Sequence, residues 1–460
     1  MNTMTADNLI QKILKIESEN QLDNLYVGGI PLWHVVRYRL RGWFFQEHGV
    51  NDISQGNKAK LPVSEALKFL LISFMQFAKL LCNKKHARIC FFGFTRLESV
   101  NGTYIDKFID PIIQETGIID YIYFNNQYKA RSKPRLGNRK IVYTDVISVI
   151  SLIIGLVLFP LLYIWNASVY KQLISVTRSH ITKKKKASIY VYVKSSEIFV
   201  QSRLWKIVFN VLKTKSIVGV SRVTFMSQSL AAKQLGIRVI ELQHGITMGA
   251  TNLYSGYYDS RIDPDIFCTF GSFCPLNVFG ISQSNIVEIG WAFKNYIAHL
   301  NNNVKILHNT VLFISEPAIS DILLGIIEEL AYKLPELNFH IRRHPQENYD
   351  DIQLERIKFH HNISDVSSKQ CSQLAILPYQ FIAGENSSVL FEALSIGKHV
   401  CRFNCRGLSA IGYKQNILDG FFYINSLDEF SAFIQNQNIT NARNQIYSDF
   451  NTKLFMSLIN

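Results

Sequence analysis

The sequence lacks the cysteine pairing that marks disulfide-rich and zinc-binding proteins. Its 7 cysteines are odd in number, form no Cys-x-x-Cys pair and lie near no histidines at a zinc-site spacing. Such a set is typical of a protein in a reducing compartment without a disulfide framework. Residues 1–20 are polar and mixed in charge, so no secretory signal is visible and we expect cytosolic synthesis and residence.

Acidic residues are the minority charge. The chain has 49 Lys and Arg against 35 Asp and Glu, a net charge of +14. This balance favours an acidic partner, such as nucleotide phosphates, an anionic membrane surface or nucleic acid. The basic residues are not interleaved with stacking aromatics in a recognisable module, which disfavours nucleic acid. With 460 residues, 48% of them hydrophobic, the chain is long enough for two or three domains with real cores.

Two long stretches are strongly apolar. Val146–Trp165 contains no charged residue and is long enough to cross a membrane. A single span would place the strands before and after it on opposite sides of the bilayer, so an in-plane or hairpin membrane contact is preferred to a span or a buried core helix. Ala66–Cys82 is either a helix on a bilayer surface or a buried helix. The basic run Lys183–Lys186 fits attraction to anionic lipid.

Strand and helix signals alternate along the chain, which predicts an α/β fold. Strands are expected in the first half at 87–93, 119–124, 189–193, 216–220, 238–243, 265–270 and 286–289. In the second half they are expected at 311–314, 338–342, 381–383 and 399–403. We place a first domain over residues 1–290, with the segments 66–82 and 146–165 as its membrane-associating parts, and a second domain over 291–460.

Two strand ends in the second domain predict an anion site. In the run 341–345, a proline stops the strand and leaves His344 at its carboxyl edge. In the run 384–388, the chain turns from a strand into a helix that Ser387 or Ser388 opens as N-cap. Alone, the first motif is usually a solvated loop and the second only a cap. If the two strands are neighbours, the imidazole, the hydroxyls and the unpaired N–H groups of the helix converge on one phosphate site.

The first domain carries a counterpart of this histidine. The strand 238–243 follows a helix that stops at Gly236, and it ends at His244-Gly245. His244 is therefore expected at the carboxyl edge of a parallel strand. Asp263-Pro264-Asp265 matches an Asp-x-Asp metal pattern, but aspartates around a proline just before a strand are ordinary turn formers, so we predict no metal site.

These motifs, in this order and each at a strand end, resemble the bacterial GT-B glycosyltransferases of capsule and lipopolysaccharide assembly. The similar groups are sialyl- and polysialyltransferases, β-Kdo transferases and CDP-glycerol glycerophosphotransferases. The residues that carry the resemblance are Leu242-Gln243-His244-Gly245, Arg343-His344-Pro345 and Asn386-Ser387-Ser388, within about residues 185–405. The resemblance implies two Rossmann-like domains facing each other across a cleft, metal-independent transfer without a cofactor, and a CMP- or CDP-linked donor held mainly by the second domain.

The resemblance also implies roles for single residues. It assigns the donor phosphate to Arg343, His344, Asn386, Ser387 and Ser388, and the rest of the nucleotide to Glu392 and Pro345. The acidic Asp/Glu-Asp/Glu-Gly triplet that several sialyltransferases use as general base is missing from the first domain. The candidates for the base are therefore His244, then Asp106 or Asp110, and more weakly Glu316.

Three functions remain open at this point. The first is a glycosyltransferase that adds a sugar to a polysaccharide or lipid-linked precursor at the cytoplasmic face of the inner membrane, peripherally bound to its anionic surface. The second is a CDP-polyol phosphotransferase of the same fold. The third is a non-catalytic, membrane-bound scaffold in polysaccharide assembly. A sugar-nucleotide epimerase of the same fold is a further alternative, since a fold does not determine the reaction.

Overall fold

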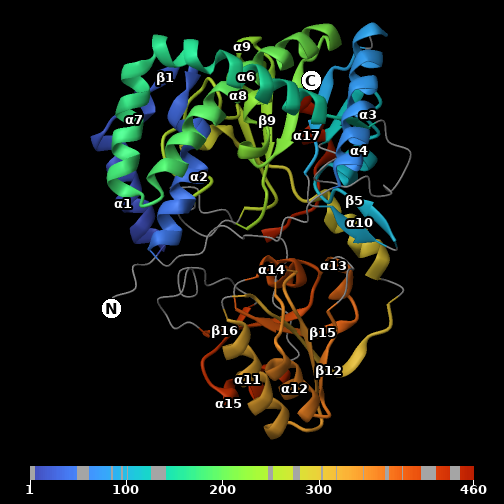
Figure 1. Cartoon of the computed structure of the whole chain (residues 1–460). Helices are drawn as coiled ribbons and strands as arrows, with labels where there is room; N and C mark the ends of the chain where they lie inside the picture. Colours follow the sequence, from blue (N-terminus) through green and yellow to red (C-terminus); the bar gives the residue numbers. More distant parts are fainter. Residues whose placement is uncertain are drawn as a thin grey trace.

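The structure of the protein is a computed structural model. It describes residues 6–48, 62–83, 86–94, 97–100, 102–125, 141–246, 252–272, 280–301, 304–317, 319–345, 347–367, 372–385, 387–405, 421–435 and 446–460. Two α/β units lie one above the other in Figure 1, each built on its own parallel sheet.

The first unit is built on a seven-stranded sheet in the order β11-β10-β9-β8-β3-β6-β7. Every neighbouring pair in it is parallel. The strands are β3 (Ile89–Phe92), β6 (Tyr121–Asn125), β7 (Ile141–Tyr143), β8 (Ser216–Val220), β9 (Arg238–Leu242), β10 (Ile266–Thr269) and β11 (Ile286–Glu288). The central strands β3 and β8 are buried along their whole length, as expected of a parallel sheet covered on both faces.

The second unit is built on a six-stranded parallel sheet in the order β14-β13-β12-β15-β16-β17. Its strands are β12 (Leu307–Ile314), β13 (Asn338–Arg342), β14 (Ile363–Asp365), β15 (Tyr379–Gly384), β16 (His399–Phe403) and β17 (Phe421–Ile424). Two small antiparallel pairs lie outside both sheets: β1 (Tyr26–Val27) with β2 (Ile30–Pro31), and β4 (Glu98–Val100) with β5 (Thr103–Ile105). The α/β class with two parallel sheets, predicted from the sequence, is confirmed.

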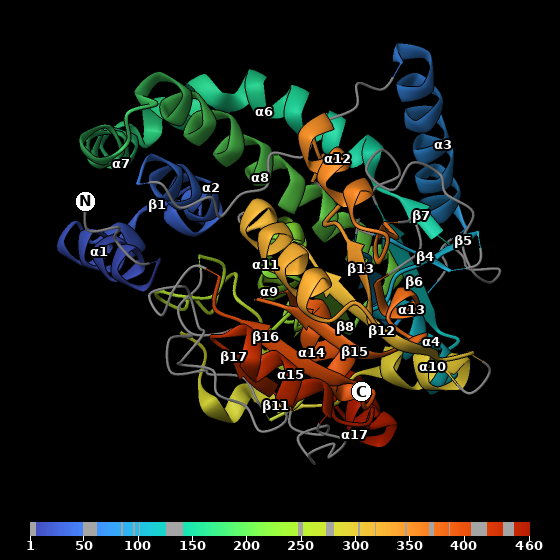
Figure 2. The same cartoon turned by 90° about the horizontal axis from the view of Figure 1, so that it is seen from below.

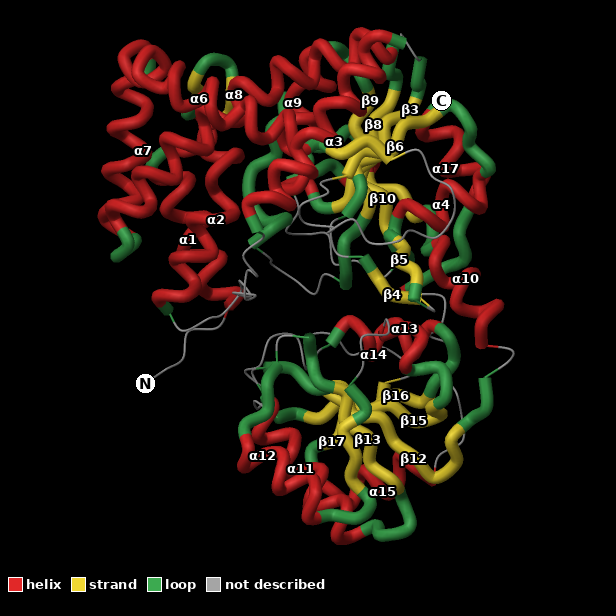
Figure 3. The backbone as a smooth tube through the Cα atoms, turned by 45° about the vertical axis from the view of Figure 1, so that its right-hand side comes forward, coloured by secondary structure: helices red, strands yellow, loops and turns green. Residues whose placement is uncertain are grey.

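Helices surround the two sheets (Figure 3). Those of the first unit are α1 (Ala6–Glu19), α2 (Leu32–Glu47), α3 (Val63–Cys82), α4 (Ile109–Thr116), α6 (Asp145–Trp165), α7 (Ala167–His180), α8 (Lys184–Leu212) and α9 (Met226–Gln234). The remaining helices are α10 (Ala292–Asn301), α11 (Ser320–Lys333), α12 (Asp351–Phe359), α13 (Ser372–Ala375), α14 (Ser388–Ser395), α15 (Leu427–Gln435) and α17 (Thr452–Ile459).

The strand expected at residues 189–193 is wrong. These residues lie inside α8, a helix of 29 residues that leads directly to β8. The local run Ile-Tyr-Val-Tyr-Val has the β-branched and aromatic composition of a strand. Tertiary packing overrides that preference, because α8 buries Ala187, Val191 and Ile198 against the helices around it.

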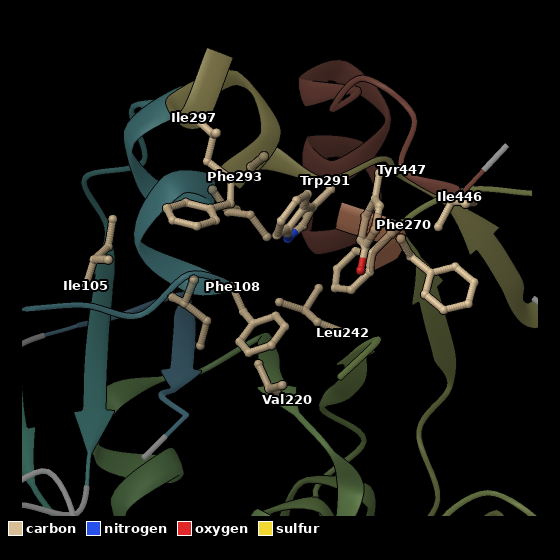
Figure 4. Close-up of a cluster of buried hydrophobic side chains, with 14 of the residues drawn as sticks. Ile105, Phe108, Val220, Leu242, Phe270, Trp291, Phe293, Ile297, Ile446 and Tyr447 are labelled. Atoms are coloured by element: carbon tan, nitrogen blue, oxygen red, sulfur yellow. The ribbon is translucent and has the colours of Figure 1, made fainter. Parts of the chain in front are cut away.

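The end of the chain returns to the first unit. Ser216 Oγ at the start of β8 donates to Ile459 O at 2.7 Å, and Arg238 Nη1 at the start of β9 donates to Leu458 O at 2.7 Å. The sequence assigned these last residues to the second domain, whereas α17 contacts α4 of the first unit. Figure 4 shows the neighbouring buried cluster, in which the rings of Tyr447 and Trp291 lie 4.4 Å apart at an angle of 34°.

The buried apolar core continues across the boundary between the units. The cluster drawn in Figure 4 belongs to a larger one that includes Val220 and Leu242, the last residues of β8 and β9, and also Leu312 and Ile314 of β12. The carboxyl ends of the strands in the two sheets therefore lie toward the same interface, where the sequence motifs were expected.

Candidate functional site

The carboxyl end of β13 presents His344, and Glu347 holds the turn that follows. The backbone N–H of His344 donates to Glu347 Oε2 at 2.5 Å. Ser315 Oγ, just after β12, donates to Glu347 Oε1 at 2.6 Å. One buried carboxylate thus joins the ends of two neighbouring strands, so the position of the His344 backbone is fixed while its side chain stays partly exposed.

Arg343 lies at the same edge and is already paired. Its Nη2 is 2.7 Å from Asp365 at the end of β14, and its guanidinium lies 4.9 Å from the centre of the Tyr349 ring. Its backbone N–H donates to Ser367 Oγ at 2.8 Å. A phosphate at this edge would share the Arg343 cation with the Asp365 carboxylate. Pro345, the last residue of the Arg343-His344-Pro345 motif, is exposed.

The second predicted motif forms the expected strand-to-helix turn. Ser387 is the N-cap of α14, and its Oγ accepts from Val389 N at 3.3 Å. Ser388 is the exposed first residue of the helix. Before the turn, a Cβ at Gly384 would lie 2.9 Å from Ile314 O, so β15 approaches β12 at a distance that only glycine permits. Asn386 lies outside the described residues.

The buried side chain of Arg402 holds the backbone of this turn. Its side chain is fully buried, and its Nε donates to Glu385 O at 2.7 Å. Its guanidinium lies 5.7 Å from the ring centres of Phe391 and Tyr423. No local sequence signal selects Arg402, because it lies within β16 and its contact with the turn depends on the pairing of β15 with β16.

The two motifs lie at one level of the sheet, but their strands are not neighbours. β12 runs between β13 and β15. Ile314 at the end of β12 pairs with Arg342 on one side and with Gly384 on the other. Two strand spacings correspond to roughly 10 Å. The condition set for convergence, that the two strands are neighbours, is therefore not met: the His344 turn and the amino end of α14 flank the end of β12.

Glu392, predicted to contact the nucleotide, is buried and already hydrogen-bonded to other side chains of the protein. On α14, its carboxylate accepts from Gln373 Nε2 at 2.6 Å and from Lys107 Nζ at 3.2 Å. Lys107 belongs to the first unit and also lies 3.7 Å from Glu98. Burial raises the pKa of Glu392, and the Lys107 ammonium opposes that shift. The Glu392 carboxylate therefore contributes to the contact between the units.

His244 follows β9 at the carboxyl edge of the first sheet, as predicted. Its ring centre lies 4.8 Å from that of Phe94 and 6.1 Å from that of Phe108. The Gln243 side chain bonds to the backbone of two segments. Its Oε1 accepts from Phe270 N at 2.8 Å, and its Nε2 donates to Gly245 O, just after His244, at 2.9 Å. His244 is a partly exposed imidazole between aromatic rings, an arrangement compatible with a general base.

The two candidate aspartates have a different environment. Asp106 is fully buried, and its carboxylate accepts from Phe94 N at 2.7 Å and from Tyr123 Oη at 2.8 Å. Asp110 Oδ2 accepts from Asp106 N at 2.8 Å. Both carboxylates hold the segment between β5 and α4, beside the rings that contact His244. The weaker candidate, Glu316, lies in the second unit, in the loop between β12 and α11.

The Asp-Pro-Asp segment takes part in structural contacts. Asp263 Oδ1 lies 3.2 Å from Arg222 Nη1, and Asp265 forms an ion pair with Lys233. Although burial opposes it, Arg222 and Arg37 hold the pKa of Asp263 below its usual value. Among the residues that the structure describes, no group of three His, Cys, Asp or Glu side chains could hold a metal ion.

Buried polar contacts connect the N-terminal helices to the segment after His244. His34 Nε2 lies 3.0 Å from Tyr257 O, and Arg37 Nη1 donates to the same oxygen at 2.9 Å. Arg41 is fully buried, pairs with Glu17 through both its Nε and Nη2, and donates from Nη1 to Ser255 O at 2.8 Å. The helices α1 and α2 therefore hold the segment 252–259 in place.

A cavity of about 390 Å³ opens beside β13, close to the His344 turn. Most of its lining residues are of apolar type, among them Leu312 and Val366, and the cation of Arg342 is its charged member. None of the predicted phosphate-site residues lines it. The cavity therefore adjoins the predicted phosphate site without forming part of it.

Two parallel α/β units whose strand ends meet at a common interface define the GT-B architecture. No protein-family profile matches the sequence, and no curated protein sequence matches it.

Solved structures with some similarity belong to nucleotide-sugar and polymer enzymes. The UDP-GlcNAc 2-epimerase of Methanocaldococcus jannaschii is 12% identical over 80% of this chain and 98% of that chain, with a TM-score of 0.47. A putative UDP-N-acetylglucosamine 2-epimerase of Listeria monocytogenes is 10% identical over 82% of this chain and 96% of that chain, with a TM-score of 0.48. A variant of the wall teichoic acid polymerase TagF is 11% identical over 86% of this chain and 97% of that chain, with a TM-score of 0.46. Similarity at this level assigns no activity, and the architecture rests on the sheets themselves.

Proposed function

We propose that the protein is a metal-independent GT-B glycosyltransferase that moves a sugar from a nucleotide-activated, CMP-linked donor to a capsule or lipopolysaccharide precursor. One observation carries the proposal: the His344 turn and the Ser387-capped end of α14 flank the end of β12 at one level. Backbone N–H groups, hydroxyls and an imidazole at one sheet edge suit a phosphate.

The proposed chemistry uses both units. His244 takes the proton of the acceptor hydroxyl as its oxygen forms a bond to the anomeric carbon of the donor. The bond from that carbon to the phosphate oxygen breaks, and the nucleotide leaves with the electron pair. His344, Ser387, Ser388 and the amino end of α14 donate hydrogen bonds to the negative charge that develops on the phosphate. The acceptor is a polysaccharide or lipid-linked chain at the cytoplasmic face of the cell membrane.

A second candidate is a CDP-polyol phosphotransferase. The feature that favours it is His244-Gly245, which resembles the His-Gly motif of that group. The phosphate site would be the same, but the group transferred would be a polyol phosphate and the leaving group CMP. The choice between the two candidates is a choice of donor, which ligand binding measures directly.

A thermal-shift panel with CMP, CDP, UDP, GDP and their sugar conjugates tests the proposal. A ligand at a hundred times its dissociation constant stabilises the folded state by about 2.7 kcal/mol. We expect a shift with a CMP-sugar, whereas a shift with CDP favours the phosphotransferase and one with UDP or GDP rejects both. CMP is the leaving group of both reactions, so a shift with CMP supports the nucleotide site without separating the two candidates.

Matched variants localise the binding. His344→Ala should lose most of the shift, while His361→Ala, which removes an exposed histidine of the same unit, should keep it. Folded protein that responds to no nucleotide would reject the donor site and favour a scaffold.

A further inference from the structure

The outer side of α6 is an exposed apolar surface. Among the described residues, α6 is the one helix long and apolar enough to cross a membrane. Its exposed large hydrophobic residues are Val149, Ile150, Leu152, Ile153, Ile154, Leu156, Val157, Leu161, Ile164 and Trp165. A soluble protein rarely leaves so large an apolar patch in water, and such a patch marks a binding surface.

A second helix extends this surface. On α3, the exposed large hydrophobic residues are Val63, Leu67, Leu71, Phe74, Met75 and Leu81. The two helices are joined at the edge of the first sheet, where Ser73 Oγ of α3 accepts from Val146 N of α6 at 3.1 Å. Figure 2 shows α6 across the top of the view and α3 at its right-hand side, and Figure 1 shows both in the half of the first unit away from the second sheet.

The fold opposes a transmembrane course for α6. α8 runs antiparallel beside it: Gly155 approaches the backbone of Ser196, and the ring centres of Phe159 and Tyr192 lie 4.9 Å apart. α8 also carries charged residues, among them the ion pair Lys194–Glu197. If α6 crossed the bilayer, these charges would enter hydrocarbon at a high cost in free energy. The helix instead lies on the protein along its length.

The chemistry of the exposed face favours lipid over a protein partner. Protein interfaces carry about one hydrogen bond per 100–200 Å² and have a polar rim. From Val149 to Ile164 the exposed side chains of α6 are all apolar. The face ends at Trp165, a residue type enriched at membrane–water interfaces. Exposed lysines lie near this face, at Lys171 on α7 and at Lys68 and Lys79 on α3. The net charge of the chain is +14.

We propose that α3 and α6 together form one docking surface for an anionic lipid bilayer, with α6 lying in the plane of the membrane. The apolar faces of both helices enter the boundary between headgroups and acyl chains, at a depth of about 5–10 Å. This surface gives the proposed transferase its membrane location, but it does not depend on nucleotide chemistry.

Trp165 is a natural reporter for this proposal. It is 76% exposed, whereas the other tryptophans, Trp33, Trp43, Trp205 and Trp291, are buried. With vesicles that contain phosphatidylglycerol, we expect a blue shift of its emission and quenching by lipids brominated near the headgroup. Vesicles of phosphatidylcholine alone should give a weaker response, and Trp165→Phe should abolish it.

The depth of two tryptophans separates in-plane binding from a span. Ile153→Trp in the Trp165→Phe background moves the reporter by twelve residues, which is about 18 Å along a helix. An in-plane helix places the two reporters at the same depth. A difference in depth of that size would overturn the proposal.

Vesicle flotation tests the residues themselves. We expect Ile153→Asp combined with Val157→Asp to weaken vesicle binding at least about tenfold, because two charges replace apolar side chains that enter the bilayer. The control is Phe359→Asp, a substitution at an 85% exposed aromatic of the second unit, and it should bind as the wild type does.

Two outcomes contradict the docking surface. One is a double variant that floats as well as the wild type. The other is self-association of the wild type, without lipid, that the double variant loses, because it would assign the face to a second copy of the chain. The nucleotide thermal shift is read without membranes, so it fails or succeeds independently of this test.

Discussion

The Lys107 ammonium lies 3.2 Å from the Glu392 carboxylate, and this ion pair joins the two α/β units. Lys107 directly follows Asp106, next to the rings around His244, while Glu392 lies on the helix that Ser387 caps. The pair therefore connects the proposed acceptor side of the interface with the proposed phosphate side. Both side chains are largely buried, which makes the contact sensitive to substitution.

Removing the cation should destabilise the protein. Lys107→Met leaves the Glu392 carboxylate buried without its ion pair, and we expect a loss of about 3 kcal/mol in the free energy of unfolding. Adding Glu392→Gln removes the stranded charge, so the double variant should recover part of that loss. Urea unfolding of the two single variants and the double variant measures the coupling. A Lys107→Met variant within about 0.5 kcal/mol of the wild type would contradict the importance of this pair.

The proposed general base has a kinetic signature. His244→Ala should lower turnover by about 10²- to 10⁴-fold, the usual contribution of a positioned base. The nucleotide thermal shift should stay nearly unchanged, because His244 lies on the first sheet and the donor phosphate is assigned to the second. His308→Ala removes an exposed histidine and provides the control. Full turnover in His244→Ala would reject the role.

Glu347 is expected to act through the position of His344. In Glu347→Ala, the backbone N–H of His344 and the Ser315 hydroxyl both lose their acceptor. A buried donor left without an acceptor costs about 1–3 kcal/mol. Nucleotide affinity should fall in Glu347→Ala and fall less in Ser315→Ala, which leaves the bond to His344 intact. Equal affinities in a nucleotide titration of both variants would show that the turn is not positioned by Glu347.

His34 should make the protein sensitive to acid. Burial and the neighbouring Arg37 guanidinium lower the pKa of His34 to about 3, with Asp263 opposing the shift. In the unfolded chain the imidazole titrates near its ordinary value of about 6.5. Between these values the unfolded state binds a proton that the folded state does not, so stability falls as pH falls, by up to about 1.4 kcal/mol per pH unit.

The comparison with His34→Gln isolates this effect. Urea unfolding of both proteins from about pH 6.5 down to about pH 4 should show a flatter pH dependence for the variant. Parallel curves for the two proteins would mean that the charge state of His34 does not change on unfolding in this range.

Local signals in the sequence were sufficient for much of the fold. The strand at 338–342 was predicted with its bounds, because a proline and an apolar run mark them within a few residues. The strand at 189–193 was wrong, because packing against α6, not local composition, decides that α8 is a helix. The position of β12 between β13 and β15 is set by pairings between segments far apart in the sequence, which a single sequence does not reveal.

The same holds for the candidate site, where local signals locate some residues and long-range contacts position others. His244, His344 and Ser387 lie at strand ends as predicted, because each follows a short β-rich run and a turn signal. Their assigned chemical roles stay predictions. Lys107 and Glu392 are 285 positions apart in the sequence, so no local pattern predicts their contact. Sequence patterns locate the edges of a sheet, but the contacts that lie across those edges come from the fold.

The return of α17 to the first sheet has a consequence for synthesis on the ribosome. Ser216 and Arg238 bind the carbonyl groups of Ile459 and Leu458, so the first unit stays incomplete until residues 452–459 have emerged. Domains near the amino terminus usually fold while the rest is still being made. Here the strands of the second sheet, the last of which ends at Ile424, emerge before α17, and the apolar surface beneath α17 stays uncovered until α17 has been made.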